Sequence, residues 1–97
     1  MLKLAVVSGN SMEPTLREGQ KILISKIGTP KKGDIVVLKH PYKNINIVKR
    51  VAAANESGYL VEGDNTGEST DSRHYGTIGK ENLVGKVLFP YLSGRRR

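Results

Sequence analysis

Short apolar runs alternate with turn-forming residues along most of this chain. Clusters of Gly, Pro, Asn and Asp separate the runs, which are rich in Val, Ile and Leu and too short for typical helices. The runs cover residues 4–7, 21–27, 34–40, 44–54, 58–63 and 82–89. This pattern predicts an all-β fold, a compact folded sheet or partly open barrel.

Helical periodicity is scarce. A single helical turn is expected around residues 13–17, where Pro14 suits the first positions of a helix. Ser11 would then stand where a strand ends and a turn begins. Backbone N–H groups at such a junction can point at a developing negative charge on oxygen, so this is a favourable place for a nucleophile.

The length of 97 residues predicts one domain, which we place over residues 1–92, followed by a basic tail over residues 93–97. The apolar run at 4–7 is far shorter than the roughly 20 residues of a membrane span, and no signal-peptide pattern precedes it. We therefore expect a cytoplasmic protein. Membrane association would require an anchor that this sequence does not contain.

The chain has no cysteine, which excludes a disulfide framework, a thiolate zinc site and a thiol nucleophile. Its net charge of +7 leaves nucleic acid open as an acidic partner. However, part of that charge lies in residues 95–97, and one Phe, four Tyr and no Trp give little material for base stacking. A basic β-domain that binds nucleic acid is thus an alternative function, although nucleic acid is not the expected partner.

A serine nucleophile needs a base, and histidine held by a carboxylate is one choice. A triad could be built from His74 with Asp71 or Asp64, but the adjacent Arg73 disfavours the imidazolium that a triad must form. His40 lies in a turn after a strand, where an exposed histidine is expected.

Lysine is the other candidate base, because an amine that is desolvated among apolar side chains can accept a proton near neutral pH. Lys49 lies within the most apolar stretch, I-N-I-V-K-R-V-A-A-A, whereas the other lysines stand in turns, at strand edges or at exposed positions. In a strand, Lys49 and Arg50 point to opposite faces. Alternation alone does not decide which of the two turns inward.

Several motifs resemble those of the type I signal peptidase family in order and approximate spacing, from about residue 7 to residue 88. They are S-M-E-P-T-L at 11–16, G-D-I-V-V at 33–37, I-V-K-R-V at 47–51, G-D-N-T-G-E-S-T-D-S-R-H-Y-G at 63–76 and L-V-G-K-V at 83–87. The resemblance implies a fold of the signal peptidase and LexA catalytic-domain type. It also implies a serine endopeptidase that uses a Ser/Lys dyad.

By position, the resemblance makes Ser11 the nucleophile and Lys49 the general base. A lysine ammonium has no acceptor, so a nearby hydroxyl can accept one of its protons and orient it. The other implied roles are Ser69 as that hydroxyl, Asp71 and Arg73 as a structural ion pair, and Asp64 and Asn65 as supports of the loop.

The resemblance also bears on the oxyanion hole and the substrate. The Ser11 N–H would donate one hydrogen bond and the preceding turn the other. Much of the family has a serine two residues before the nucleophile, but here Gly9 holds that position and Ser8 lies one residue further away. Met12 is expected to line pockets for small substrate side chains. The expected partner is a precursor protein or extended peptide, and no metal or other cofactor is expected.

The spacing of the motifs indicates which subgroup of the type I signal peptidase family the chain resembles. Val51 and Gly63 are separated by only eleven residues, 52–62, where bacterial signal peptidases usually carry a long insertion. The compact form resembles the maturation proteases of nickel-type superoxide dismutase, which remove a short leader. LexA-type repressors also use serine and lysine, but they lack the segment from G-D-N to D-S-R. A catalytically silent module that captures extended peptides is the remaining alternative.

Overall fold

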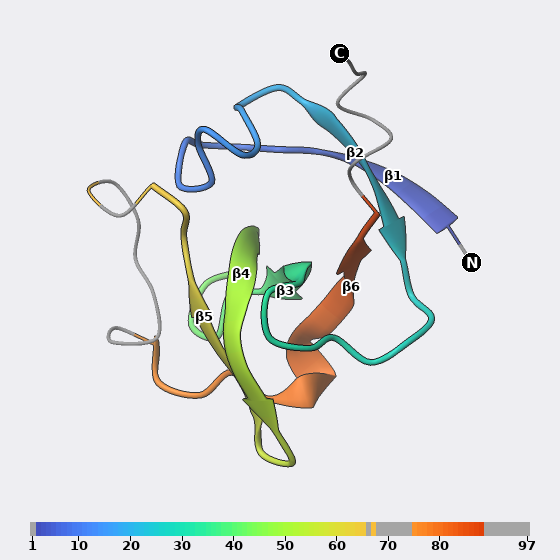
Figure 1. The fold of residues 1–97 in the computed structure, drawn as a ribbon, viewed down its shortest axis with the longest axis vertical. Helices are drawn as coiled ribbons and strands as arrows, with labels where there is room; N and C mark the ends of the chain where they lie inside the picture. Colours follow the sequence, from blue (N-terminus) through green and yellow to red (C-terminus); the bar gives the residue numbers. More distant parts are fainter. Residues whose placement is uncertain (1, 66, 68–74, 89–97) are drawn as a thin grey trace.

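The computed structural model describes residues 2–65, 67 and 75–88, and shows an antiparallel sheet (Figure 1). The predicted tail at 93–97 and the end of the predicted domain lie outside these residues. The strands are β1 (Leu2–Val6), β2 (Lys21–Ser25), β3 (Ile35–Lys39), β4 (Asn46–Asn55), β5 (Gly58–Glu62) and β6 (Leu83–Val87), with a 3₁₀ turn η1 (Lys80–Asn82) before β6. Their order is β1-β2-β6-β3-β4-β5, so the sheet has β1 and β5 as its edges and does not close into a barrel. The predicted all-β class is confirmed.

Strand β3 lies inside the sheet and is buried on both faces, which explains its unbroken apolar sequence I-V-V-L. Ile35 and Val37 pack into one core cluster, while Val36 and Leu38 pack into the other. Burying each such side chain contributes about 1.5–3 kcal/mol. The remaining buried members of the first cluster are Val7, Met12, Leu16, Ile22, Ile24 and Val87, and those of the second are Val51, Tyr59, Val61, Tyr75 and Ile78.

Strand β4 is the longest strand and changes partner along its length. It pairs with β3 over residues 46–50, but its pairing with β5 begins only at Arg50. A register shift between Val51 and Ala53 bends the second half. Residues 46–48 therefore have no strand partner on the side away from β3 within the described part of the chain.

The loop that carries Ser11 is closed at its base by backbone hydrogen bonds. Val7 N–H donates to the Gln20 carbonyl at 2.9 Å, and Gly19 N–H donates to the Val7 carbonyl at 2.8 Å. Inside the loop, Leu16 N–H donates to the Met12 carbonyl at 2.9 Å, which is one turn of helical hydrogen bonding near the predicted turn. The buried side chains of Met12 and Leu16 anchor this turn in the first core cluster.

Candidate active site

Ser11 and Lys49 line the same pocket, which has a volume of about 390 Å³. The serine comes from the loop after β1, and the lysine comes from the half of β4 that pairs only with β3. Two residues that are 38 positions apart in the sequence are thereby brought to one surface. The other lining residues are Ser8, Gly9, Asn10, His40, Lys43, Ile45, Asn46, Ile47, Val48 and Tyr75.

Lys49 is the one buried charged residue in the described part of the chain, with 3% of its surface exposed. Its neighbours on the same face of β4 are Ile47 and Val51, which pack in or against the second core cluster. Arg50 points to the other face and leaves 30% of its side chain exposed. The structure thus decides which of the two cations turns inward. Burial by itself disfavours the charged form of an amine, as a general base requires.

Two hydrogen bonds from Asn65 hold the backbone around Ser11. The Asn65 N–H donates to the Ser11 carbonyl at 2.8 Å, and the side-chain amide donates to the Asn10 carbonyl at 3.0 Å. The Ser11 N–H itself donates no hydrogen bond to any described residue. At such a junction of strand and turn, a backbone N–H can donate to an acceptor that enters the pocket.

Asp64 joins this loop to the strand that carries Lys49. Its carboxylate accepts hydrogen bonds from Arg50 Nε at 2.9 Å and Nη2 at 2.7 Å, and another from the Thr15 hydroxyl. Arg50 also donates from Nη1 to the Gly33 carbonyl at 2.7 Å. The Arg50 hydrogen bonds, with a smaller contribution from Thr15, lower the pKa of Asp64, and the hydrogen bond to Asp64 raises the pKa of Arg50. Asp64 thus contacts residues beside the dyad, Arg50 and Thr15, whereas Asn65 contacts the backbone of Ser11 itself.

Thr15 and Arg50 have roles that the sequence alone did not predict. Both lie within the motifs already recognised, and both are beside a proposed catalytic residue or its turn. A cation on the outward face of β4 needs a carboxylate within reach, and Asp64 lies just after β5, the neighbouring strand. That signal was present in the sequence, but the motif resemblance assigned Asp64 only to support of the loop.

Other predicted residues lie in different surroundings. Gly9 and Ser8 line the pocket, and Gly9 has a φ of +84°, which favours glycine. Met12 is 1% exposed within the first core cluster and is not among the residues that line the pocket. Its position is that of a core residue beneath the loop. The predicted Ser69, Asp71, Arg73 and His74 lie outside the described residues, so their roles stay predictions.

His40 lines the pocket and is half-buried, rather than an exposed turn residue as expected. Its Nδ1 accepts hydrogen bonds from the N–H groups of Tyr42 at 3.0 Å and Lys43 at 3.1 Å. The ring also packs edge-on against Tyr75, with centroids 5.1 Å apart. Because Nδ1 is occupied by two donors, the histidine fixes the turn at 40–43.

A smaller apolar depression adjoins the pocket and has a volume of about 110 Å³. It shares Ser8, Asn46 and Val48 with the pocket of Ser11 and Lys49. Its other walls are Lys3, Ala5, Val6, Ile24, Val37 and Val84. An extended chain lying past Ser11 could place a small apolar side chain here.

Residues 1–55 and 55–92 match the profile of the family described as "Signal peptidase, peptidase S26". The chain therefore belongs to the type I signal peptidase family. This match and the fold agree with the resemblance seen in the sequence motifs.

Characterised relatives support the same assignment. The chain is 33% identical over 110 residues to mitochondrial inner membrane protease subunit 1 of Xenopus tropicalis, covering 88% of this chain and 66% of that protein. It is 33% identical over 96 residues to signal peptidase I of Bacillus licheniformis, covering 95% of this chain and 44% of that protein. Signal peptidase IB of Staphylococcus aureus strain Mu50 is 27% identical over 143 residues, covering 88% of this chain and 75% of that protein.

The chain thus spans 66% and 44% of the lengths of the first two relatives.

Within the described residues, no helix has the length and apolar character needed to cross a membrane.

Proposed function

We propose that this chain is a serine endopeptidase that removes a leader or signal-type peptide from a precursor protein, with Ser11 as nucleophile and Lys49 as general base. The observation that carries the proposal is that Ser11 lines the same pocket as a buried lysine. Membership of the signal peptidase family supports the peptidase class.

The reaction begins when Lys49 Nζ accepts the hydroxyl proton of Ser11 and the serine oxygen attacks the scissile carbonyl carbon. The Ser11 N–H stabilises the resulting oxyanion. Lys49 then returns the proton to the leaving amine as the C–N bond breaks, which leaves an acyl-enzyme. Water hydrolyses the ester in the second half of the reaction, again with Lys49 as base, and restores the serine hydroxyl.

The substrate would bind in extended conformation. The side of β4 at residues 46–48 that faces away from β3 offers backbone groups to an added strand, and β1 is an edge of the sheet. The 110 Å³ depression beside Ser8 suits a small side chain near the scissile bond. Cleavage after small residues is the specificity that we propose.

The first precursor to test is that of a nickel-type superoxide dismutase. The short spacing between the motifs that end at Val51 and begin at Gly63 supports this choice. Strands β4 and β5 fill most of residues 52–62 and are joined by a tight hairpin with no inserted segment. The precursor's leader would have to enter the pocket as an extended segment.

Cleavage of a mixed peptide library, read by mass spectrometry, tests the chemistry even though the natural substrate is not identified. The purified protein is compared with Ser11→Ala and Lys49→Met, which remove the hydroxyl and the amine. Two matched controls, Ser57→Ala in the exposed β4–β5 turn and Lys21→Met on the exposed side of β2, change the same residue types elsewhere.

We expect cleavage after small residues in the wild type and both controls, and none in the two dyad variants. Cleavage that persists in Ser11→Ala and Lys49→Met would reject the dyad. If the wild type binds extended peptides with the same affinity as Ser11→Ala but cleaves none of them, the chain is a peptide-binding module instead.

A further inference from the structure

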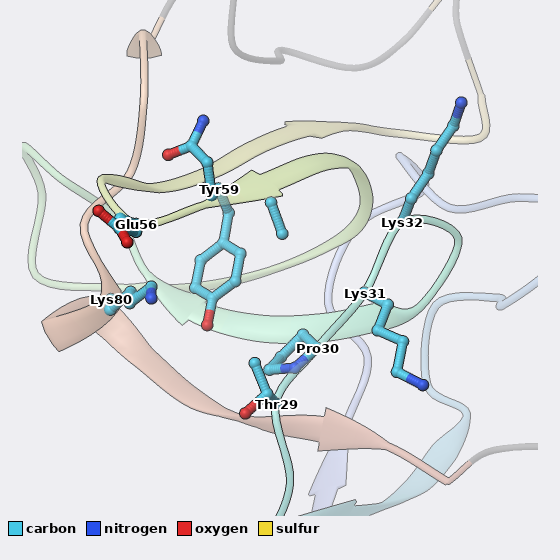
Figure 2. Close-up of a pocket in the computed structure, with 9 residues that line it drawn as sticks. Thr29, Pro30, Lys31, Lys32, Glu56, Tyr59 and Lys80 are labelled. Carbon is cyan, nitrogen blue, oxygen red and sulfur yellow. The ribbon is translucent and has the colours of Figure 1, made fainter.

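A second pocket lies away from Ser11 and Lys49, at the far end of β4 (Figure 2). Its volume is about 430 Å³, and it shares no lining residue with the pocket of the dyad. Ala54 and Asn55 contribute from the end of β4, about 16–20 Å along the strand from Lys49 at about 3.3 Å per residue. The other lining residues are Thr29, Pro30, Lys31, Lys32, Glu56, Tyr59 and Lys80.

The hydroxyl of Tyr59 is the unusual group in this pocket. Tyr59 is 2% exposed, and its ring belongs to the second core cluster. Its backbone pairs with Ile78 at 2.8 and 2.9 Å, but within the described part of the chain its hydroxyl makes no hydrogen bond. In Figure 2 the hydroxyl points toward Thr29 and Pro30, across the pocket. Buried tyrosine hydroxyls normally have a partner, so this one is suited to a bound ligand.

The charges around the pocket favour an anion. Three lysines and one glutamate line it, and Lys80 lies beside the tyrosine ring in the close-up (Figure 2). The lysine side chains are exposed and flexible, so their ammonium groups can turn toward a negative charge within the pocket. A phenol hydroxyl donates to a carboxylate or phosphate oxygen, which adds a charge-assisted hydrogen bond.

The walls add a preference for a ligand with an apolar body. Pro30, Ala54 and the ring of Tyr59 provide apolar surface next to the polar groups. Such a combination of apolar walls with a few converging polar groups is typical of small-molecule sites.

We propose that this pocket binds a small organic anion, with its carboxylate or phosphate group at the Tyr59 hydroxyl and Lys80 and its apolar body against Pro30 and Ala54. The site is independent of the proposed peptidase chemistry. Binding here leaves the pocket of Ser11 and Lys49 open to a peptide.

Titration of the ¹⁵N-labelled protein by NMR tests the site with four probes that share one ring. Phenylacetate and phenyl phosphate carry the anionic group, benzyl alcohol is neutral, and benzylamine is cationic. We expect both anions to shift the amide signals of residues 29–32, 54–56, 59 and 80 with saturation in the millimolar range, as for other fragment-sized ligands. The neutral and cationic probes should produce much smaller shifts. Equal binding of benzylamine, or no saturable shift with either anion, would overturn the proposal.

Substitutions then test the assigned contacts. Tyr59→Phe removes only the hydroxyl and keeps the ring in the core, so we expect affinity for phenylacetate to fall about tenfold. Lys80→Met should weaken binding about threefold, since this lysine is exposed. Lys21→Met and Ser11→Ala should bind as the wild type does. Undiminished binding by Tyr59→Phe would show that the hydroxyl is not a ligand contact and would reject the site as described.

Discussion

Asp64 holds Arg50 by two hydrogen bonds, from Nε at 2.9 Å and from Nη2 at 2.7 Å. Arg50 directly follows Lys49 in β4, while Asp64 directly precedes Asn65, whose N–H binds the Ser11 carbonyl. The pair therefore connects the backbone on both sides of the proposed dyad. Because the Arg50 side chain is 30% exposed, loss of Asp64 would leave behind a cation that is only partly solvated.

Replacing Asp64 with Asn should destabilise the protein by about 1–3 kcal/mol, because the neutral amide cannot accept both guanidinium hydrogen bonds and the Thr15 hydroxyl. Urea unfolding followed by circular dichroism measures the free energy of unfolding. Glu18→Gln, an exposed change in the loop after β1 that no hydrogen bond or ion pair links to Arg50 or Asp64 in the described residues, is the control and should alter it by a few tenths of a kcal/mol. A loss in Asp64→Asn no larger than in the control would contradict the role of this ion pair.

The stability that Asp64 provides should disappear in acid. Its pKa is lowered from the ordinary value of 3.8, so the folded protein binds this proton more weakly than the unfolded chain does. The contribution is therefore complete above pH 3.8 and is lost as pH falls through the lower folded pKa. The stability difference between the wild type and Asp64→Asn, measured in urea, should stay constant above that pH and shrink below it. A difference that grew on acidification would contradict this sign.

Gly58 should not tolerate a side chain. It starts β5 with a φ of +138°, and an added Cβ would lie 2.1 Å from the Ile78 carbonyl oxygen. Gly58→Ala must therefore move backbone, and we expect a loss of more than about 2 kcal/mol in the free energy of unfolding. Gly19→Ala is a matched control with a positive φ of +86° but open space, and should cost about 1 kcal/mol. Equal losses would show that φ alone, not contact with Ile78, determines the requirement.

Much of the fold was predictable because each strand carries its own local pattern of β-branched residues. The strand order was not, because β6 inserts between β2 and β3 through contacts that lie far apart in the sequence. Likewise, alternation placed Lys49 and Arg50 on opposite faces, but only the packing of Ile47 and Val51 shows which face is inside.

The contacts around the proposed dyad were less predictable from the sequence than Ser11 and Lys49 themselves. Thr15 and Asp64 are separated by 49 positions, and Arg50 and Asp64 by 14, so no local rule pairs them. Met12 follows the proposed nucleophile, but the single helical turn directs its side chain into the core. Tertiary packing decides each of these relationships.

The turn at His40 should shape the pocket of the dyad. Its Nδ1 accepts from the N–H groups of Tyr42 and Lys43, so His40→Leu leaves both donors without this acceptor. His40→Asn retains an acceptor oxygen near the same position and serves as the matched variant. We expect amide hydrogen exchange at Tyr42 and Lys43 to accelerate at least about tenfold in the leucine variant and less in the asparagine variant. Exchange in the leucine variant no faster than in the wild type would show that the Nδ1 bonds do not hold the turn.

Peptidase activity should fall as the pH is lowered, since Lys49 is a base only in its neutral form. Burial favours that form, so kcat/KM should decline gradually toward acid and be far below its maximum at about pH 5. The pH profile is measured on the best peptide from the library, with circular dichroism at each pH to confirm that the protein stays folded. Asp64→Asn should keep the same profile down to pH 5, because Asp64 titrates below pH 3.8 and the variant leaves Lys49 in place. A decline that vanishes in Asp64→Asn would assign the pH dependence to the ion pair, whereas activity that stays flat in the folded wild type would reject Lys49 as the base.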